Sequence, residues 1–378
     1  MQLAILIRLP AHSHAPAAAV CSAFKALMSN SEFKIQRRAA GYEEQYLVAA
    51  AGYGGNCCAD AGCAVRTASG WARLPDLPPH MPERPDLPGV SESAAVVVGD
   101  SFYLLGGEGS GEPGTGTDSV FSIQPHRRGC DLSWHYEPKM PASLCYHVAG
   151  AHDGIIVVTG GRCDDDAQGW YGETGTSSAS TFRFNVESGT WTEGARMPAP
   201  RQGAVGAVID GVLHVLGGFA EDWEGGDEDG RVYDGAIVYS YDVAANTWKE
   251  RAPSGRHVVQ WSTYHDVISA VAKGGKMYLL SKETAFTANS YSTTIHLYIF
   301  DPATFTFTRG PDLPSNRSTG YGGVRLGVFN GEVTAVGLFR DQGCYVLDEC
   351  REHWNAVTPA EGATHFVCPM TSVATVYK

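Results

Sequence analysis

Three arginines recur at corresponding places in this 378-residue chain. Each ends a short proline-containing segment: MPAPR ends at Arg201, APSGR at Arg256 and LPSNR at Arg317. A guanidinium group is planar and can pair with a carboxylate or phosphate through two parallel hydrogen bonds. If the three segments meet in the fold, the arginines predict a binding site for such a group. The alternative is that arginine after proline only belongs to the structure of the segment.

Two Tyr-His pairs add groups that could accept or donate a proton. Tyr146 and His147 follow a cysteine, and Tyr264 precedes His265. A histidine beside a bound carboxylate can act as a general base. We favour the simpler interpretation, in which each histidine makes a hydrogen bond within its own repeat. The sequence therefore predicts no catalytic residue, no metal and no cofactor.

A repeated pattern of roughly fifty to sixty residues must position these groups. Each clear copy holds two short apolar runs, a tight Gly/Asp turn between them and a closing Gly pair. The copies read SAAVVVGDSFYLLGG (93–107), HVAGAHDGIIVVTGG (147–161) and AVGAVIDGVLHVLGG (204–218). A later run of each repeat begins at an aromatic residue, and these are Trp71, Trp134, Trp191, Trp248, Phe307 and Trp354. Short strands at this spacing favour an all-β radial repeat over a sandwich.

The pattern resembles the kelch repeat family over about residues 45–378. The resemblance implies an all-β fold, a six-bladed kelch-type β-propeller, with the recurring aromatic packed between neighbouring blades. The segment THFVCPMTSVATVYK (364–378) reads as a strand that lacks a partner, whereas QYLVAAAGY (45–53) lacks a preceding strand. We therefore expect the C-terminal strand to close the ring by joining the first blade, which removes exposed sheet edges.

Composition limits the compartment and the partners. Residues 1–44 are rich in alanine and poor in acids, which predicts a poorly structured N-terminal extension or an organelle targeting segment. The formal charge of −13 argues against nucleic acid, and no apolar run is long enough for a membrane helix. The ten cysteines form no C-x-x-C pair. We expect a cytoplasmic protein with reduced thiols.

Strand direction predicts which face of the ring binds. First-to-second connections are minimal turns, whereas second-to-third and inter-blade connections lie on the opposite face, the long-loop face. Its expected loops are 108–118, 162–180, 219–235 and 282–293. Three tryptophans outside the repeat position fall on this face, namely Trp170, Trp223 and Trp261. Together with the arginines they predict a contact surface.

Two classes of function remain open. The first is a binding module that recognises a protein or acidic peptide through the long-loop face, as many kelch propellers do. The second is a stand-alone kelch-fold enzyme for a small carboxylate-bearing or sugar substrate, similar to the sialic-acid epimerases, in which Arg201, Arg256 or Arg317 holds the carboxylate and His147 or His265 moves a proton. A copper-radical oxidase, which the resemblance also suggests, is a weaker fit because the ring has one blade too few. Neither class involves nucleic acid or a membrane.

Overall fold

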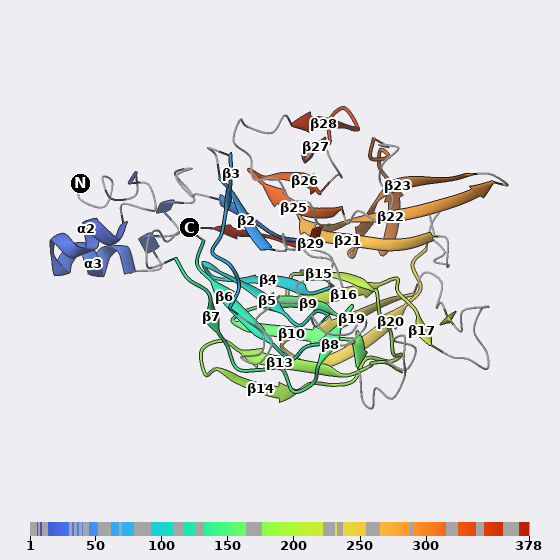
Figure 1. Cartoon of the computed structure of the whole chain (residues 1–378), viewed down its shortest axis with the longest axis horizontal. Coiled ribbons are helices and arrows are strands. Elements are labelled where there is room, and N and C mark those ends of the chain that lie inside the picture. The colour runs from blue at the N-terminus through green and yellow to red at the C-terminus, as the bar shows by residue number, and fades with distance from the viewer. Residues whose placement is uncertain are drawn as a thin grey trace.

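The computed structural model describes most of the repeat region and parts of the N-terminal segment. The described residues are 6, 8–9, 14–29, 32–33, 36–37, 40, 45–51, 62–67, 70–78, 92–108, 116–125, 132–163, 176–221, 231–232, 237–254, 265–287, 290–314, 324–337, 344–357 and 370–377. Within them, the chain forms six antiparallel sheets of four strands each, which are the blades of the ring (Figure 1). This confirms the all-β propeller that the repeat predicts.

Each blade runs from an innermost strand near the ring axis to an outermost strand at the rim. In that order, blade 1 contains β29 (Met370–Tyr377), β1 (Gln45–Ala51), β2 (Gly62–Thr67) and β3 (Gly70–Arg73). Blade 2 contains β4 (Ala94–Val98), β5 (Ser101–Leu105), β6 (Val120–Ile123) and β7 (His135–Tyr136). Blade 3 contains β9 (Val148–His152), β10 (Ile155–Thr159), β13 (Thr181–Asn185) and β14 (Thr190–Glu193).

The second half of the ring has the same plan. Blade 4 contains β15 (Val205–Ile209), β16 (Val212–Leu216), β19 (Val238–Asp242) and β20 (Thr247–Arg251). Blade 5 contains β21 (His265–Lys273), β22 (Lys276–Thr287), β23 (Ser290–Asp301) and β24 (Thr306–Arg309). Blade 6 contains β25 (Arg325–Phe329), β26 (Glu332–Val336), β27 (Cys344–Asp348) and β28 (His353–Val357). Short strands on the connections are β8 (Leu144–Cys145), β11 (Arg162–Cys163), β12 (Thr176–Ser177), β17 (Ala220–Glu221) and β18 (Arg231–Val232).

The innermost strands contact one another in a closed circle. Contacts run from β4 to β9, β15, β21, β25 and β29, and then back to β4. The C-terminal strand β29 pairs antiparallel with β1, from Tyr377 opposite Gln45 to Met370 opposite Ala51. The ring is therefore closed by the last strand of the chain, as the sequence predicts.

The core lies between blades rather than within them. It consists of six clusters of buried apolar side chains, among the described residues, and each cluster draws on two adjacent blades. The recurring aromatic residues pack between blades, which confirms the prediction. Four of the tryptophans also form a hydrogen bond across the interface through the indole. The Nε1–H donates to a carbonyl of the segment that leaves the preceding blade: Trp134 to Pro75, Trp191 to Pro138, Trp248 to Ala195 and Trp354 to Pro311, over 2.8–3.1 Å.

The Gly pair ends the second strand of a blade by turning the chain sharply. Gly106 has a φ of +56°, and a Cβ atom there would lie 2.5 Å from the Leu144 carbonyl oxygen. In blade 5 the pair is replaced by Ser281 and Lys282, so nothing stops the ladder and β22 runs on to Thr287. The expected loop at 282–293 is therefore wrong: most of it is a long hairpin (orange in Figure 1), whose Thr and aromatic residues favour strands.

The N-terminal segment contains regular structure that we did not expect. Two short helices are described there, α2 (His14–Val20) and α3 (Ser22–Ser29), and they contact each other. Alanine is the strongest helix former, which accounts for helices in this Ala-rich part. The targeting role of residues 1–44 stays a prediction. No helix in the described part of the chain has the length and apolar character needed to cross a membrane.

We expect removal of β29 to destabilise the whole ring. A chain that ends after Pro369 loses the ladder with β1, at a cost on the order of 5 kcal/mol in the free energy of unfolding, because each net hydrogen bond contributes about 1 kcal/mol. Moving residues 370–377 to a place directly before Gln45, joined by an Asn-Gly turn, should restore the stability. Urea denaturation of the three chains measures this. Equal stability of the truncated and full chains would contradict the closure.

We expect Trp134→Phe to lower the free energy of unfolding by about 1–2 kcal/mol, because the Pro75 carbonyl loses its donor. Tyr136→Phe, two residues further along the chain in β7, is the control, since Tyr136 is 62% exposed and should change stability by less than about 0.5 kcal/mol. Denaturation with urea compares the two. If both variants lose the same amount, the indole hydrogen bond does not stabilise the blade interface.

Candidate functional site at the mouth of the central channel

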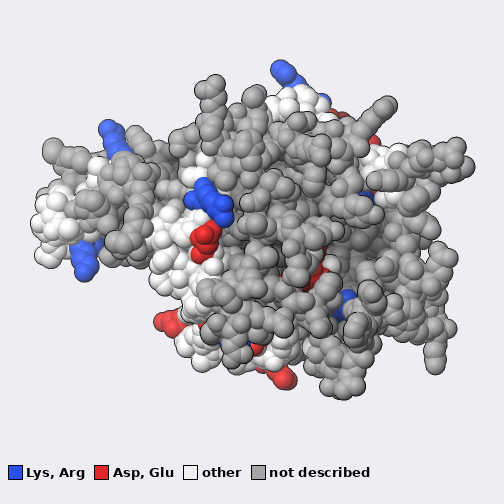
Figure 2. Space-filling view, viewed as in Figure 1, with Lys and Arg blue, Asp and Glu red and all other residues white. Residues whose placement is uncertain are grey.

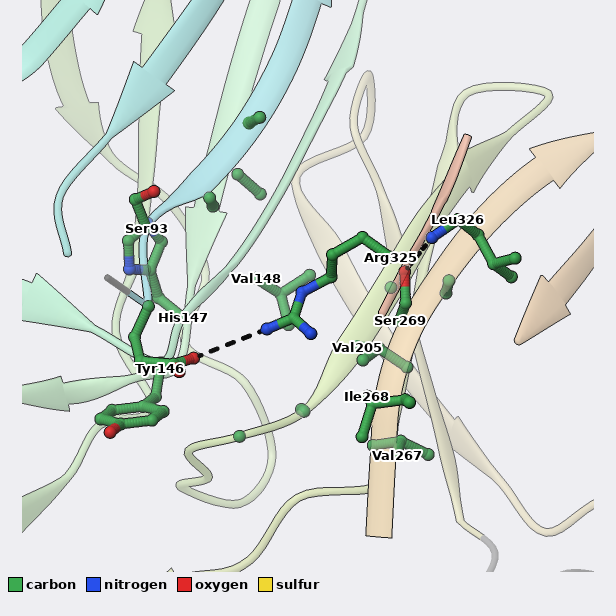
Figure 3. Close-up of a pocket in the computed structure, with 18 residues that line it drawn as sticks. Ser93, Tyr146, His147, Val148, Val205, Val267, Ile268, Ser269, Arg325 and Leu326 are labelled. Carbon is green, nitrogen blue, oxygen red and sulfur yellow. Dashed lines mark hydrogen bonds and ion pairs between the residues drawn. The ribbon is translucent and has the colours of Figure 1, made fainter. Parts of the chain in front are cut away.

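A cavity of about 310 Å³ lies on the axis of the ring, where five innermost strands begin (Figure 3). It is lined by residues 92–95, 146–149, 203–206, 267–270 and 325–326, which lead into or form β4, β9, β15, β21 and β25. Because inter-blade connections enter the innermost strands at this end, the cavity opens on the long-loop face. We call it the channel mouth.

Arg325 supplies the cationic group of the channel mouth. It begins β25 and pairs with Val336, the fifth residue of the second strand of its blade. The same register position holds Ala94, Val148, Val205 and Ser269 in the other blades. A long guanidinium side chain therefore stands where the ring otherwise places small residues, and Figure 3 shows it extending from β25 toward Tyr146. Burial lowers the pKa of Arg325, while the nearby Glu92 carboxylate opposes that effect.

Glu92 lies across from this guanidinium. Its Oε2 is 3.9 Å from Nη2 of Arg325, longer than the 2.7–2.9 Å of a charge-assisted hydrogen bond. Burial raises the pKa of Glu92, Arg325 lowers it, and the neighbouring Glu108 carboxyl raises it again. Burial and the Glu108 charge thus favour the protonated form of Glu92, whereas the Arg325 guanidinium favours its carboxylate.

Tyr146 connects the two acids. Its hydroxyl donates to Oε1 of Glu108 over 3.0 Å, and Glu108 is itself buried at the end of the β5 segment. The pKa of Tyr146 is raised above its usual range, first by burial and then by the Glu92 and Glu108 charges. The tyrosine is therefore a hydrogen-bond donor at any ordinary pH.

A chain of backbone hydrogen bonds holds these residues around the mouth. The amide of Tyr146 donates to the Glu92 carbonyl over 3.1 Å, and the amide of Gly203 donates to the Tyr146 carbonyl over 3.0 Å. All three occupy the same place, two residues before an innermost strand, and all have positive φ, at 53°, 56° and 66°. Only glycine adopts this conformation freely, so Glu92 and Tyr146 each bear a strain of about 1–2 kcal/mol.

His147 lines the cavity but packs as a neutral core residue. It is 7% exposed, and a Cβ atom at Gly106 would lie 2.7 Å from its Cε1 atom. Burial lowers the pKa of His147 to about 4. Neither ring nitrogen has a hydrogen-bond partner among the described residues. The ring is therefore wedged between blades 2 and 3, without the hydrogen bond that we expected of it.

Arg201 has a different place from the one we expected. It is 2% exposed, its Nη1 donates to the Gly217 carbonyl, and its guanidinium lies 4.7 Å from the centre of the Tyr239 ring. These contacts join blades 3 and 4, and Arg201 is not among the residues that line the cavity. The segment after the proline turns the side chain inward, so Arg201 serves packing.

The remaining residues of the predicted site lie mostly outside the described part of the chain. Arg256, Arg317, Trp170, Trp223, Trp261 and Tyr264 lie outside the described residues. His265 begins β21, where only its backbone is described. Their roles at the long-loop face stay predictions.

Sequence reasoning missed Arg325, Glu92 and Glu108. The signal for Arg325 was present, because aligning the innermost strands on their turns, such as Asp210-Gly211 and Asn330-Gly331, places this arginine at a position of Ala, Val and Ser. No such alignment distinguishes Glu92 or Glu108. In the described part of the chain, no three His, Cys, Asp or Glu residues are arranged to hold a metal ion.

Comparisons with known proteins give the same repeat. A family model described as Kelch motif matches residues 143–198. Alpha-scruin of Limulus polyphemus is 28% identical over 208 residues, 54% of this chain and 20% of that protein. Kelch-like protein 15 of Danio rerio is 29% identical over 171 residues, 41% of this chain and 25% of that protein.

Two further matches extend the comparison. N-acetylneuraminate epimerase 1 of Escherichia coli is 30% identical over 114 residues, 30% of this chain and 26% of that protein. The match therefore spans about a fifth to a quarter of the length of these three relatives. The solved structure of YjhT aligns with a TM-score of 0.51 and 14% identity, over 74% of this chain and 86% of that one, and so shares the fold.

We expect the protein to lose stability as the pH falls from 6.5 to about 4. Folding favours neutral His147, whose pKa is about 4 in the fold, whereas an unfolded histidine takes up a proton below 6.5. The difference corresponds to about 3 kcal/mol at the acid end. Urea denaturation at a series of pH values measures this. Between pH 6.5 and 4, the free energy of unfolding should fall less in His147→Leu than in the unchanged protein, with exposed His135→Gln as control. An equal decrease in His147→Leu and in the unchanged protein would contradict this.

Proposed function

Because the chain is a kelch-repeat protein with a β-propeller fold, we propose that it is a binding module that holds a carboxylate group of a partner protein at the channel mouth. The observation that carries the proposal is Arg325, whose guanidinium extends into an axial cavity at a position where the other blades have Ala, Val or Ser. Those short neighbours leave room for a ligand beside the cation.

The chemistry of the mouth suits a carboxylate. A guanidinium offers two parallel N–H groups to the two oxygens of such a group. Nη1 of Arg325 donates to the Val324 carbonyl over 3.2 Å, and the Glu92 carboxylate lies 3.9 Å from Nη2. The described charged side chains on the face in Figure 2 lie scattered, without a continuous basic patch. We expect Arg325 to be the main anchor for a bound carboxylate.

Protein partners are favoured by the relatives named Kelch-like proteins and by the position of the mouth on the long-loop face. An acidic side chain from a partner loop would enter along the axis and meet Arg325, while the surrounding loops contact the rest of the partner. This proposed surface also includes the tryptophans and arginines predicted from the sequence, namely Trp170, Trp223, Trp261, Arg256 and Arg317.

A second candidate is an enzyme for a small carboxylate-bearing sugar. It is supported by Glu92 and Tyr146, which line the same cavity as Arg325 and whose pKa values are raised by burial, and by the similarity to an N-acetylneuraminate epimerase. In that case Arg325 would hold the substrate carboxylate and Glu92 would exchange a proton with the sugar. The ligand chemistry at Arg325 is the same in both candidates.

We expect Arg325→Gln to weaken carboxylate binding by roughly 10- to 100-fold, because a hydrogen-bonded charge pair contributes about 1.5–3 kcal/mol. The probes are an array of capped pentapeptides with a central Glu or Asp, each paired with its Gln or Asn counterpart, and N-acetylneuraminate. Fluorescence anisotropy measures the peptides and calorimetry the sugar acid. Binding of the acidic peptides would indicate a protein partner, whereas binding of N-acetylneuraminate would indicate a small sugar acid.

Arg351→Gln is the matched control for this experiment. Arg351 belongs to the same blade, on the turn between β27 and β28 at the opposite face, and its side chain is 78% exposed. It should bind the probes as the unchanged protein does. Equal binding by Arg325→Gln, or equal binding of Glu and Gln peptides, would refute the proposed function.

A further inference from the structure

We propose that the channel mouth takes up a carboxylate together with one proton, and that Glu92 carries this proton. The inference rests on the proposed carboxylate site at Arg325 and concerns how that site is regulated. Without ligand, Glu92 is the internal acid that faces the guanidinium across 3.9 Å. When a ligand carboxylate approaches Arg325, Glu92 accepts a proton and its negative charge is removed from the cavity.

The charges around Glu92 make this coupling necessary. Of the described residues, those that face it are Arg325 from β25, Glu108 after β5 and Tyr146 before β9. Two acids therefore already share one cation. A third carboxylate would leave two uncompensated negative charges in a partly buried space, where repulsion is strong because solvent screening is weak. Taking up one proton removes half of that excess.

Glu92 is better placed than Glu108 to accept the proton. Glu108 is engaged, since it accepts the hydroxyl hydrogen bond of Tyr146 over 3.0 Å. Burial raises the pKa of Glu92, and the adjacent Glu108 charge adds to the effect. Glu92 is also the acid next to Arg325, so its neutralisation removes a negative charge that repels a ligand carboxylate at this guanidinium.

The backbone at position 92 has a conformation that favours glycine over a residue with a side chain. Glu92 has a φ of +53°, and the corresponding residue of blade 4 is Gly203, which bears no strain there. Glycine at position 92 would relieve about 1–2 kcal/mol. A non-glycine residue held in this conformation is typical of functional positions. The hydrogen bond from the Tyr146 amide to the Glu92 carbonyl keeps the strained segment in place.

Calorimetry in two buffers of different ionisation enthalpy, phosphate and Tris, counts the protons bound with the ligand. The probes are the tightest Glu pentapeptide of the array and N-acetylneuraminate, between pH 5 and 8. For the unchanged protein we expect uptake to approach one proton per carboxylate as the pH rises, with affinity falling up to tenfold per pH unit. Glu92→Gln should bind without proton uptake, with an affinity that hardly depends on pH and exceeds that of the unchanged protein at pH 8.

Glu137→Gln is the control, because Glu137 accepts a hydrogen bond from Ser122 in the outer part of blade 2 and is remote from the mouth. It should keep the proton uptake. Binding without uptake in the unchanged protein, or uptake that persists in Glu92→Gln, overturns the coupling. If Arg325→Gln abolishes binding while no proton is taken up, the carboxylate site holds and the coupling alone fails. If Arg325→Gln binds normally, or no probe binds, the carboxylate site and the proton coupling are both refuted.

A measurement without ligand tests the same acid. The raised pKa of Glu92 means that the folded state favours its protonated form, so this stability is present below 4.5 and is lost as the pH rises through the folded value. Glu92→Gln should therefore gain stability over the unchanged protein as the pH increases above 4.5, in urea denaturation. Parallel curves for the two proteins would show that the folded state does not favour protonated Glu92, and would overturn the choice of Glu92 as the proton carrier.

Discussion

Contact between neighbouring blades is the interaction on which the rest of this structure depends. A sheet must bury its apolar face against another element, and in this ring every core cluster of the described residues is shared by two blades. The indole hydrogen bonds act at these interfaces, because each fixes a fourth strand to the exit segment of the preceding blade. Blade 5 has Phe307 at this position, whose ring packs on Phe300 without a donor. The position of each of these blades is thereby fixed relative to the blade before it.

The channel mouth follows from the same constraint. Its residues come from segments that cross between blades, and the amide-to-carbonyl chain from Gly203 to Tyr146 to Glu92 joins three of these crossings. A strained conformation at two of the positions is tolerated because packed blades on both sides determine where the segments lie. The cavity therefore has a wall built from packed blades, with Arg325 and Glu92 facing each other across it, rather than a site made by loops alone.

Much of the fold could be predicted from local signals, whereas the site could not. Turns such as Asp153-Gly154 and the Gly pairs mark strand ends directly, since few residues adopt positive φ. The same rule explains the error in blade 5, where Ser281 and Lys282 contain no stop and the strands continue. Arg201 shows the limit of motif position, because the chain direction after a proline does not reveal that the side chain turns back to the Gly217 carbonyl. Arg325 required a comparison by strand register, and Glu92 and Glu108 depend on contacts between blades that no local pattern records.

Pairing of β29 with β1 also has a consequence for synthesis. The first blade emerges from the ribosome early but waits for the final residues of the chain before its innermost strand exists. Until then β1 presents an unpaired edge, the kind of surface that promotes association between nascent chains. Ring closure is necessarily a late event with contacts between residues far apart in sequence, which slows folding. Nascent chains of this protein are therefore expected to need chaperone protection until β29 has been synthesised.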